Sequence, residues 1–471
     1  MLSVRLLLTV LAFNLLVTIY FVIWSVSQIA MAPLAAVYLR LHQRRHTVRA
    51  RALVANLASP PRVSIVMPAF NECLTIVESV RALLALDYQA CEIVVVNDGS
   101  TDETLAVLTD TFHLVPAPVA LDQPLPTAAV RGTYRSISAP SLVVIDKVNA
   151  RCKADASNAG INAASGPLVL IIDADTILAA DALSRAVLPF LEDPTTIAVG
   201  ANVALSNGCR IEDGRIVEVA LPRSWLARFQ IVEYMRGFLL FRLACASRNG
   251  VAIISGAFGL FRRDAVIAVG GYDTSAIGED MDLTIRLQQH YRQLGRPFVI
   301  SFDPNPLAWT QAPEDWQSLK GQRCRWRRGL LQVLWRYRHL IGNPRFGVVG
   351  AAVLPYTAFV EGVGPLLEMA GYIIVTIAAL FGWLNWTWWA VMIAVSFLCG
   401  TAMTFVAVLL SDVATRRYMG GSDLVLLVIA VLLENCGYRQ LNAWWGCIGT
   451  YQTLTGKRGW GEMKRKAFEG A

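Results

Sequence analysis

The sequence predicts an α/β domain built on a mostly parallel sheet, with membrane helices toward both ends of the chain. Between residues 60 and 345, short apolar runs alternate with helical segments, a pattern typical of parallel sheets. Two long runs, Leu6–Leu39 and Met369–Leu410, contain no charged residue. About 20 apolar residues span a bilayer, whereas a signal peptide has an apolar core of only about 7–15 residues. We therefore predict an integral membrane protein and exclude a cleaved signal peptide.

The chain is predicted to have three parts. Residues 1–51 hold an N-terminal transmembrane segment and a basic flank, residues 52–345 a cytoplasmic domain, and residues 346–471 a C-terminal transmembrane region with a short cytoplasmic tail. The N-terminal run is either one long tilted helix or a hairpin broken near Pro33. Five arginines lie between Arg40 and Arg51 with no acidic residue among them. The positive-inside rule therefore places the following domain in the cytoplasm.

The composition argues against several classes of enzyme. The nine cysteines show no zinc-site spacing, and the five histidines fall in no obvious catalytic pattern. This argues against hydrolysis by a serine–histidine pair or by a histidine-bound metal. The formal net charge of +7 suits an anionic lipid surface or an anionic substrate.

Strands and helices alternate in the first half of the cytoplasmic domain. The predicted strands are 62–68, 92–96, 142–145 and 168–172, and the predicted helices are 74–85, 153–164 and one through Leu108 that is capped by Ser100 or Thr101. The run Leu168–Ile172 is continuously apolar, which predicts a central strand buried on both faces. Since one strand after another ends in a carboxylate, we expect a site along one edge of the sheet.

Two amphipathic helices follow, at about 225–245 and 321–340. The first has a wide apolar face, and the second carries an apolar stripe surrounded by arginines. Both are interpreted as helices lying at the membrane surface. For the first, an ordinary core helix fits the pattern as well.

The C-terminal region is predicted to contain at least two spans. Within Met369–Leu410, the segment Gly382–Trp386 is the expected turn between two helices, rich in the aromatic residues typical of membrane interfaces. The segments 346–360 and 423–454 are apolar but interrupted by charged residues. Spanning, re-entrant and interfacial arrangements all remain open for these two segments.

Acidic residues at strand ends predict a ligand site. Asp173 and Asp175 directly follow the central strand and are two residues apart, so both can reach one hard cation such as Mg²⁺ or Mn²⁺. Aspartates that merely form a turn are the simpler alternative. Asp98 follows the second strand, where a carboxylate can accept hydrogen bonds from a base or a ribose.

Two helical segments add further candidates. Glu279 and Asp280 follow Gly278 at the start of a helix, where acids either act in catalysis or complement the helix dipole. Gln322, Arg325 and Trp326 share one patch of a helix. A guanidinium can clamp a pyrophosphate and an indole can face a sugar ring, although a basic membrane-surface helix would look similar.

Taken together and in this order, the motifs resemble the processive membrane glycosyltransferases of glycosyltransferase family 2, a group that includes cellulose, chitin, hyaluronan and poly-N-acetylglucosamine synthases. The resemblance implies a GT-A domain, with a Rossmann-like sheet that binds a nucleotide sugar and a divalent metal. The matching segments are VSIVMPAFNE (63–72), VVVNDGSTDET (94–104), KADASNAGI (153–161), IIDADT (171–176), SGAFGLFRRD (255–264), GED (278–280) and QRCRW (322–326).

The resemblance also implies a role for individual residues. Asp280 corresponds to the general base, Asp175 to a ligand of Mg²⁺ or Mn²⁺, and Asp98 to the aspartate near the uracil and ribose. The remaining correspondences are Asp173, Lys153 and Arg325 to the nucleotide sugar, and Gln322, Trp326 and Glu279 to the acceptor. Lys153 departs from the family pattern, because Cys152 replaces a glycine, one residue is extra and Ser157 replaces a leucine.

The expected function is inverting transfer from a UDP-sugar, with UDP-N-acetylglucosamine or UDP-glucose as donor, to a growing exopolysaccharide of the kind found in biofilms. The β-linked product would leave through a channel formed by the protein's own helices. The alternative is a non-processive enzyme that adds one sugar to a lipid or lipid-linked acceptor. We expect a multi-pass protein of the inner (cytoplasmic) membrane with a cytoplasmic catalytic domain. Its partners would be the donor, the acceptor, the bilayer and secretion proteins, but no nucleic acid.

A transporter with a regulatory domain is the competing class. Acidic residues in or near the apolar segments, Glu361, Glu368 and Glu434, would then mark its path. Against this interpretation, the motifs that carry chemistry all lie outside the membrane segments.

Overall fold

The computed structural model describes residues 2–46, 54, 57, 59–122, 124–415 and 421–457. The predicted boundary at residues 51 and 52, the basic pair Arg416 and Arg417, and the tail after residue 457 lie outside the described residues. All statements below concern the described parts of the chain.

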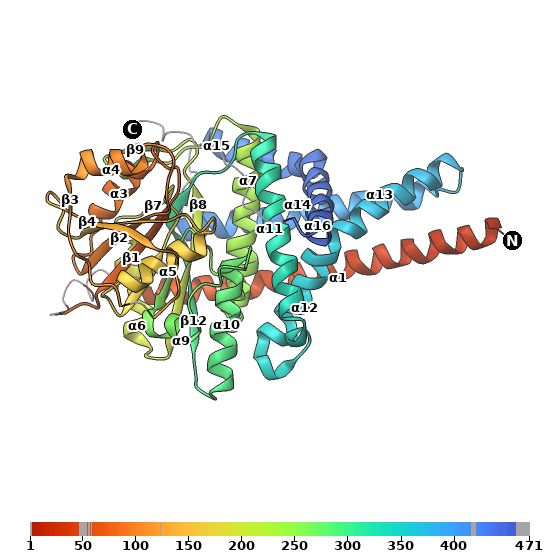
Figure 1. The fold of residues 1–471 in the computed structure, drawn as a ribbon. Coiled ribbons are helices and arrows are strands. Elements are labelled where there is room, and N and C mark those ends of the chain that lie inside the picture. Colours follow the sequence, from red (N-terminus) through yellow and green to blue (C-terminus); the bar gives the residue numbers. More distant parts are fainter. Residues whose placement is uncertain are drawn as a thin grey trace.

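A ten-stranded sheet forms the body of the domain outside the apolar helices (Figure 1), with the strand order β3-β4-β5-β2-β1-β6-β11-β8-β12-β7. The strands are β1 (Val63–Ala69), β2 (Cys91–Asn97), β3 (Leu114–Pro116), β4 (Val130–Ser136), β5 (Leu142–Lys147), β6 (Leu168–Ile171), β7 (Ile177–Leu178), β8 (Thr196–Leu205), β11 (Gly259–Arg262) and β12 (Val299–Thr310). A separate hairpin joins β9 (Arg210–Glu212) and β10 (Arg215–Glu218).

The pairings confirm a mostly parallel sheet. Strands β5, β2, β1 and β6 pair in parallel, and so do β8 and β12. Following the pairings across the sheet, seven of the ten strands run in one direction, while β4, β11 and β7 run in the other. The carboxyl ends of the parallel strands therefore share one edge, as the sequence predicted, and β6 lies in the middle of the sheet.

The helix α5 (Lys153–Ala163) packs closely on the sheet. It contacts β1 and β2. A Cβ atom at Gly160 would overlap the Val66 side chain, so only glycine permits this close approach. Lys153, the first residue of the helix, is thereby fixed beside the carboxyl end of β6.

The predicted cap at Ser100 or Thr101 is wrong. The helix α4 begins only at Thr104, and it ends at Phe112. Ser100 Oγ instead accepts a hydrogen bond from the Asn71 N–H (3.0 Å), and the Thr101 N–H donates to Asn71 Oδ1 (2.8 Å). These bonds join the loops after β1 and β2, so the two residues are not free to cap a helix.

Four further helices lie around the sheet: α3 (Ile76–Leu84), α6 (Ala182–Glu192), α9 (Arg263–Ala268) and α10 (Glu279–Gln293). The helix α3 corresponds to the predicted helix 74–85 and is somewhat shorter. The helix α10 begins at the acidic residues where a helix start was predicted.

Two helices stand between the sheet and the apolar helices (Figure 1). The first is α7 (Trp225–Met235), which continues as the π-helical segment η1 (Arg236–Arg242) and as α8 (Leu243–Ala246). The second, α11 (Trp316–Arg336), begins five residues earlier than predicted. Phe238 on η1 is buried and stacks against Phe302 of β12. Because η1 also packs on α1 and α14, much of its apolar surface is covered by protein, and contact with lipid stays a prediction.

Four helical stretches are long and apolar enough to cross a membrane: Leu15–Gln43, Val349–Leu380, Trp386–Ala414 and Ser422–Leu454. The first belongs to α1 (Leu2–His46), which continues through Pro33, so the single long helix is correct. The predicted pair of spans corresponds to α13 (Gly364–Leu380) and α14 (Trp386–Thr415). Figure 1 shows α1 and α13 projecting away from the sheet in the same direction.

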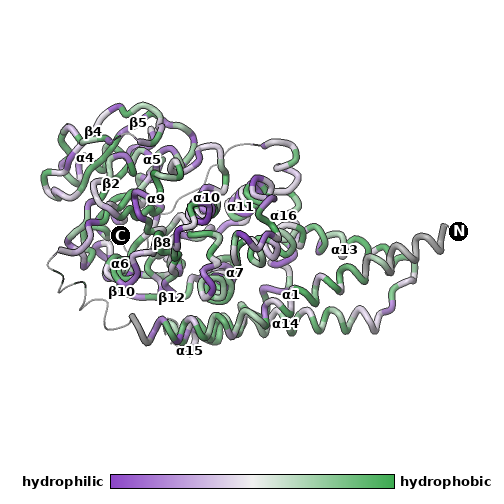
Figure 2. Tube along the Cα trace, turned by 90° about the horizontal axis from the view of Figure 1, so that it is seen from below, coloured by the Kyte–Doolittle hydropathy of each residue, from purple (hydrophilic) through white to green (hydrophobic). Residues whose placement is uncertain are grey.

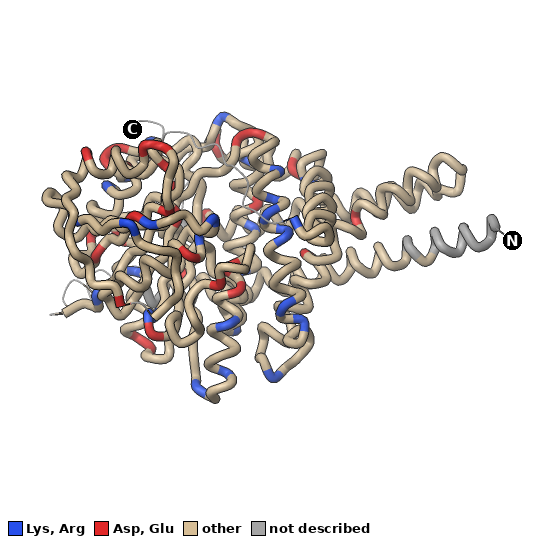
Figure 3. Tube along the Cα trace, in the orientation of Figure 1, with Lys and Arg blue, Asp and Glu red and all other residues tan. Residues whose placement is uncertain are grey.

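The two segments 346–360 and 423–454, whose arrangement the sequence left undecided, have distinct structures. Residues 349–363 continue into α13 through η4 (Val349–Val353), α12 (Leu354–Tyr356) and η5 (Thr357–Val363). A kink at Cys436 and Gly437 separates α15 (Gly421–Leu433) from α16 (Arg439–Leu454). The projecting helices are largely apolar (Figure 2), and charged residues concentrate over the sheet and the helices next to it (Figure 3). This distribution fits a membrane protein with one large polar domain.

Candidate active site

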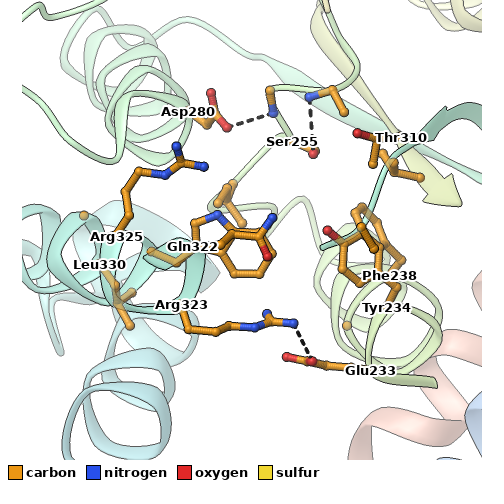
Figure 4. A pocket seen from close by; sticks show the side chains of 18 of the residues that line it. Glu233, Tyr234, Phe238, Ser255, Asp280, Thr310, Gln322, Arg323, Arg325 and Leu330 are labelled. Carbon is orange, nitrogen blue, oxygen red and sulfur yellow. Dashed lines mark hydrogen bonds and ion pairs between the residues drawn. The ribbon is translucent and has the colours of Figure 1, made fainter. Parts of the chain in front are cut away.

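A cavity of about 940 Å³ lies at the carboxyl edge of the sheet (Figure 4). Its walls include the loop after β6, the start of α10, and one side each of α7, η1 and α11. The same cavity extends to the apolar helices, where Trp24 and Gln28 of α1, Tyr356 of α12 and Glu361 of η5 line it. The site at the sheet is therefore continuous with a space between the apolar helices.

Most of the predicted site residues line this one cavity. They come from four separate elements: the start of α5, the loop after β6, the start of α10 and the middle of α11. The residues are Lys153, Asp173, Asp175, Glu279, Asp280, Gln322, Arg325 and Trp326. The fold thus brings together residues that the sequence separates by up to 173 positions (Lys153 to Trp326).

Asp173 and Asp175 follow β6 and face different partners. Asp173 forms an ion pair with Lys153, whose Nζ is 2.5 Å from Oδ1. Asp175 is buried, with 3% of its surface exposed, and Thr310 at the end of β12 donates a 3.3 Å hydrogen bond to its Oδ1. The residues are thus held in place by groups from α5 and β12.

The backbone of Gly256 lies between Lys153 and Asp280. Its N–H donates a 2.7 Å hydrogen bond to Asp280 Oδ2, and its carbonyl oxygen accepts a 3.1 Å hydrogen bond from Lys153 Nζ. A Cβ atom at position 256 would lie 2.8 Å from each of these two side-chain atoms. The absence of a side chain at Gly256 is what lets the carboxylate and the ammonium both reach the backbone here.

The acids at the start of α10 are difficult to ionise. Burial and, to a smaller extent, the neighbouring Asp280 carboxylate raise the pKa of Glu279 to about 8. Burial also raises the pKa of Asp280, against the lowering effect of Lys153. A carboxyl group with a raised pKa is a better proton acceptor once it is ionised, which suits a general base.

Lys153 keeps its charge in this buried position. Burial alone would lower the pKa of its ammonium group, but nearby carboxylates raise the pKa above the ordinary value, Asp173 most strongly. The positive charge therefore stays next to the carboxylates of the cavity.

The helix α11 reaches the cavity through a close contact between two glycines. A Cβ atom at Gly329 would lie 2.9 Å from the backbone nitrogen and Cα of Gly278. This contact sets α11 against the start of α10, and Figure 4 shows Arg325 directed toward Asp280. Gln322 is also buried here, and its Oε1 has no hydrogen-bond partner within the described part of the chain.

Trp326 remains available to a ligand. Its side chain is 42% exposed and lines the cavity. The guanidinium of Arg323 lies 4.5 Å from its ring centroid, and Tyr234 of α7 approaches at 6.5 Å between centroids. Arg323 is itself fixed by Glu233, at 2.7 Å. An exposed aromatic surface flanked by polar groups is suited to a sugar ring.

Asp98 lies outside the group of residues that line the cavity. Its Oδ1 pairs with Lys147 Nζ at 2.5 Å, and Asp155 pairs with the same nitrogen at 2.6 Å. Lys147 is fully buried. Burial raises the pKa of Asp98, against the lowering effect of Lys147. Sequence reasoning missed Lys147, although a lysine at the end of the apolar strand LVVIDK was a usable signal.

The two carboxylates after β6 are suited to bind a hard cation together with a substrate. Asp173 and Asp175 supply carboxylate oxygens, which Mg²⁺ and Mn²⁺ prefer. Among the residues that the structure describes, no group of three or more His, Cys, Asp or Glu side chains is arranged to hold a metal alone. Metal ions of this type commonly complete their coordination with water and substrate phosphates.

Residues 60–329, more than half of the chain, match the sequence profile described as glycosyltransferase like family 2. The chain belongs to this family. The predicted family membership is thereby confirmed, and the glycosyltransferase domain extends from the start of β1 to the middle of α11.

The glycosyltransferase is similar to two bacterial polysaccharide synthases. It is 29% identical over 274 residues to the poly-beta-1,6-N-acetyl-D-glucosamine synthase of Staphylococcus aureus strain COL. It is 27% identical over 274 residues to the enzyme of the same name from Staphylococcus epidermidis. Each alignment covers 58% of this chain and 56% of the relative. The chain therefore matches about half the length of these relatives.

A solved structure shares the overall fold. The mannosyltransferase PcManGT from Pyrobaculum calidifontis, in complex with GDP-Man and Mn²⁺, aligns with a TM-score of 0.52 and 17% identity. The alignment covers 92% of this chain and 99% of the mannosyltransferase. This likeness confirms the GT-A fold of the glycosyltransferase.

Proposed function

We propose that this glycosyltransferase transfers a sugar from a UDP-sugar to a growing polysaccharide, inverts the anomeric centre and exports the β-linked product between its own helices. The observation that carries the proposal is one continuous cavity. Asp173, Asp175 and Asp280 line it at the sheet, and Trp24 and Glu361 line it among the apolar helices. A transfer site that opens directly toward the membrane helices suits an enzyme whose product leaves by that route.

In this proposal Asp280 is the general base. Its carboxylate takes the proton from an acceptor hydroxyl while the hydroxyl oxygen attacks the anomeric carbon of the donor. The new bond forms on the face opposite the leaving diphosphate, whose bond to the sugar breaks in the same step. An α-linked donor then gives a β-linked product. The 2.7 Å hydrogen bond from the Gly256 N–H orients Asp280 for this task.

The donor would occupy the part of the cavity nearest the sheet. Asp173 and Asp175 would hold Mg²⁺ or Mn²⁺, which supplies positive charge next to the leaving diphosphate. Arg325 and the charged Lys153 add positive charge from the chain itself. Asp98 at the end of β2 is proposed to contact the base or the ribose, and the Lys147 ion pair holds its carboxylate in place.

The acceptor would enter from the side of α11. Gln322, with its unpaired buried oxygen, and the exposed ring of Trp326 are proposed to bind the acceptor sugar, next to Glu279. UDP-N-acetylglucosamine is the first choice of donor, because the two synthases similar to this chain are named for polymers of N-acetylglucosamine. UDP-glucose is the second choice.

The orientation of the protein in the membrane is part of the proposal. The catalytic domain is proposed to face the cytoplasm, with the helices in the inner membrane. The arginines between Arg40 and Arg51 support this orientation through the positive-inside rule. Secretion proteins would then receive the polymer on the far side.

A panel of radiolabelled UDP-sugars tests this proposal. The full-length protein, purified in detergent, is incubated with each donor, with Mg²⁺, with Mn²⁺ or with a chelator, and the products are sized. We expect metal-dependent release of UDP from one donor and a polymeric product. A product carrying a single added sugar would establish the non-processive alternative, and no release of UDP from any donor would contradict the proposal.

A further inference from the structure

The guanidinium of Arg242 lines the cavity without a partner that neutralises it. Arg242 ends the π-helical segment η1 and stacks on Phe238, with its Cζ 4.0 Å from the ring centroid. Its Nη1 is buried and has no hydrogen-bond partner, and no ion pair to Arg242 occurs among the described residues. A buried nitrogen of a charged group without a hydrogen-bond partner is costly. This points to a ligand that completes the site.

Arg242 occupies the boundary between the transfer site and the apolar helices. Burial lowers its pKa to about 10, while the charges of Asp280 and Glu361 act in the opposite direction. Both acids line the same cavity as Arg242. Asp280 lies at the start of α10 and Glu361 lies in η5. The guanidinium still keeps its charge at neutral pH, because a pKa of about 10 lies well above it.

Glu361 is the second group in this position. It belongs to the π-helical segment η5, and its side chain is exposed to the cavity that Arg242 also lines. Its backbone carbonyl accepts a hydrogen bond from Arg327. Within the described chain the carboxylate of Glu361, like the guanidinium of Arg242, forms no ion pair. π-Helical segments are rare and occur frequently at functional sites.

The two charges together favour a neutral polar ligand. A lone arginine would attract a phosphate or a carboxylate, but the carboxylate of Glu361 in the same cavity offsets that attraction. The guanidinium donates hydrogen bonds to hydroxyl, ring or amide oxygens, and the carboxylate accepts them from hydroxyl or amide hydrogens. A sugar unit with hydroxyl and N-acetyl groups offers both kinds of partner.

We propose that Arg242 and Glu361 form a carbohydrate subsite on the membrane side of Asp280, which binds a sugar unit of the acceptor chain. The proposal rests on the proposed function, because it assumes that the cavity holds a carbohydrate acceptor. It adds a binding site, the two residues that form it and the chemical class of its ligand. The walls beside it are aromatic, since Phe241 stacks on Tyr356 at 5.2 Å between centroids.

Direct binding of an oligosaccharide tests the subsite. The probe is a tetrasaccharide of β-1,6-linked N-acetylglucosamine, titrated into the full-length protein in detergent and followed by calorimetry. Arg242→Gln and Glu361→Gln should each weaken binding about 10-fold or more, the loss expected for a hydrogen bond to a charged group. Arg242→Lys should bind with intermediate affinity, because it keeps the charge but loses the planar fork.

Arg248→Gln is the matched control. Arg248 follows α8, is exposed and does not line the cavity, so this variant should bind the tetrasaccharide like the parent. UDP affinity, measured on every variant, reports whether the donor side is folded. If Arg242→Gln has lost UDP affinity, Arg242→Lys takes its place in the comparison.

The outcomes separate this proposal from the proposed function. Tetrasaccharide affinity that is equal in the parent, Arg242→Gln and Glu361→Gln would overturn the subsite. So would a parent that releases UDP from a UDP-sugar but does not bind the tetrasaccharide. Binding of inorganic pyrophosphate that depends on Arg242 while tetrasaccharide binding does not would show an anion site instead. A parent that releases no UDP from any donor would contradict the proposed function itself.

Discussion

The N–H of Gly256 donates a 2.7 Å hydrogen bond to Oδ2 of Asp280, and the carbonyl of the same residue accepts one from Lys153. One residue without a side chain thus fixes the spacing between the proposed base and a buried ammonium group. The two partners come from different helices, α10 and α5, so Gly256 also joins the two halves of the site.

Gly256→Ala should impair transfer more than it impairs folding. The added Cβ would lie 2.8 Å from both Asp280 Oδ2 and Lys153 Nζ, which forces the carboxylate out of its position. Because a displacement of about 1 Å can cost about 10²-fold in rate, we expect a loss of that order in turnover. Turnover and thermal unfolding are measured together. Gly371→Ala serves as a control for the added methyl group, since nothing lies within 4 Å of its Cβ position and its φ is not positive. A Gly256→Ala enzyme with parental turnover would show that the spacing is not critical.

Asp280→Asn and Asp175→Asn should fail in different ways. If Asp280 is the base, Asp280→Asn binds donor and metal nearly normally, while transfer falls by at least about 10²-fold. Asp175→Asn removes a charge from the proposed metal site, so metal affinity, donor affinity and rate should all fall. Donor affinity and turnover are measured for both variants. Asparagine is an equally good residue at a helix start, so near-full turnover of Asp280→Asn would end the assignment as base.

The Glu279–Asp280 pair should make stability depend on pH. Burial raises the pKa of Glu279 from 4.5 in the unfolded chain to about 8 in the folded protein. Between these two pH values the folded protein therefore holds a proton that the unfolded chain releases. The stabilisation is present at low pH and is lost as the pH rises toward about 8. Glu279→Gln removes this dependence. The difference in Tm between Glu279→Gln and the parent should therefore increase from pH about 5.5 to about 8.5, and an equal difference at both values would contradict the raised pKa.

The turn between α13 and α14 should face away from the cytoplasm. By the positive-inside rule, the arginines between Arg40 and Arg51 are predicted to lie inside. Arg416 and Arg417, which lie outside the described residues, are predicted to be inside as well. Asn385 in the turn is exposed. A cysteine introduced at Asn385 should react with an impermeant reagent in intact cells whose outer membrane is permeable to the reagent, with the native cysteines as the background control. Labelling that requires lysed cells would refute this topology.

The glycosyltransferase domain should not remain soluble when separated from the apolar helices. A fragment from Pro61 to Arg345 would uncover the faces of α7 and η1 that pack against α1, α14 and α15, and the exposed ring of Trp326 would add to them. Large exposed apolar patches promote association. We expect aggregation without detergent, measured by size-exclusion chromatography. A monodisperse fragment in plain buffer would count against a tight junction between the domain and the helices.

Some of the fold followed from local patterns. The uncharged runs predicted α1, α13 and α14, and continuous apolar runs predicted β1, β2, β5 and β6, because hydrophobic periodicity acts over a few residues. The antiparallel strands β4 and β11 were not predicted. The segment Val130–Ser136 is polar and partly exposed, and Gly259–Arg262 is short, so neither gives a clear strand signal.

The sequence by itself determined the family, the membrane character and the set of acids and arginines from which the site is built, because these are properties of composition and of motifs with fixed spacing. The tertiary structure decided the partners of these residues. Gly256 and Lys153 are 103 residues apart, and Asp98 and Lys147 are 49 apart, so their pairing depends on which strand ends meet in space. The same is true of Arg242 and Glu361, since a charge in a cavity is recognised as lacking an ion-pair partner only when every surrounding element is in place.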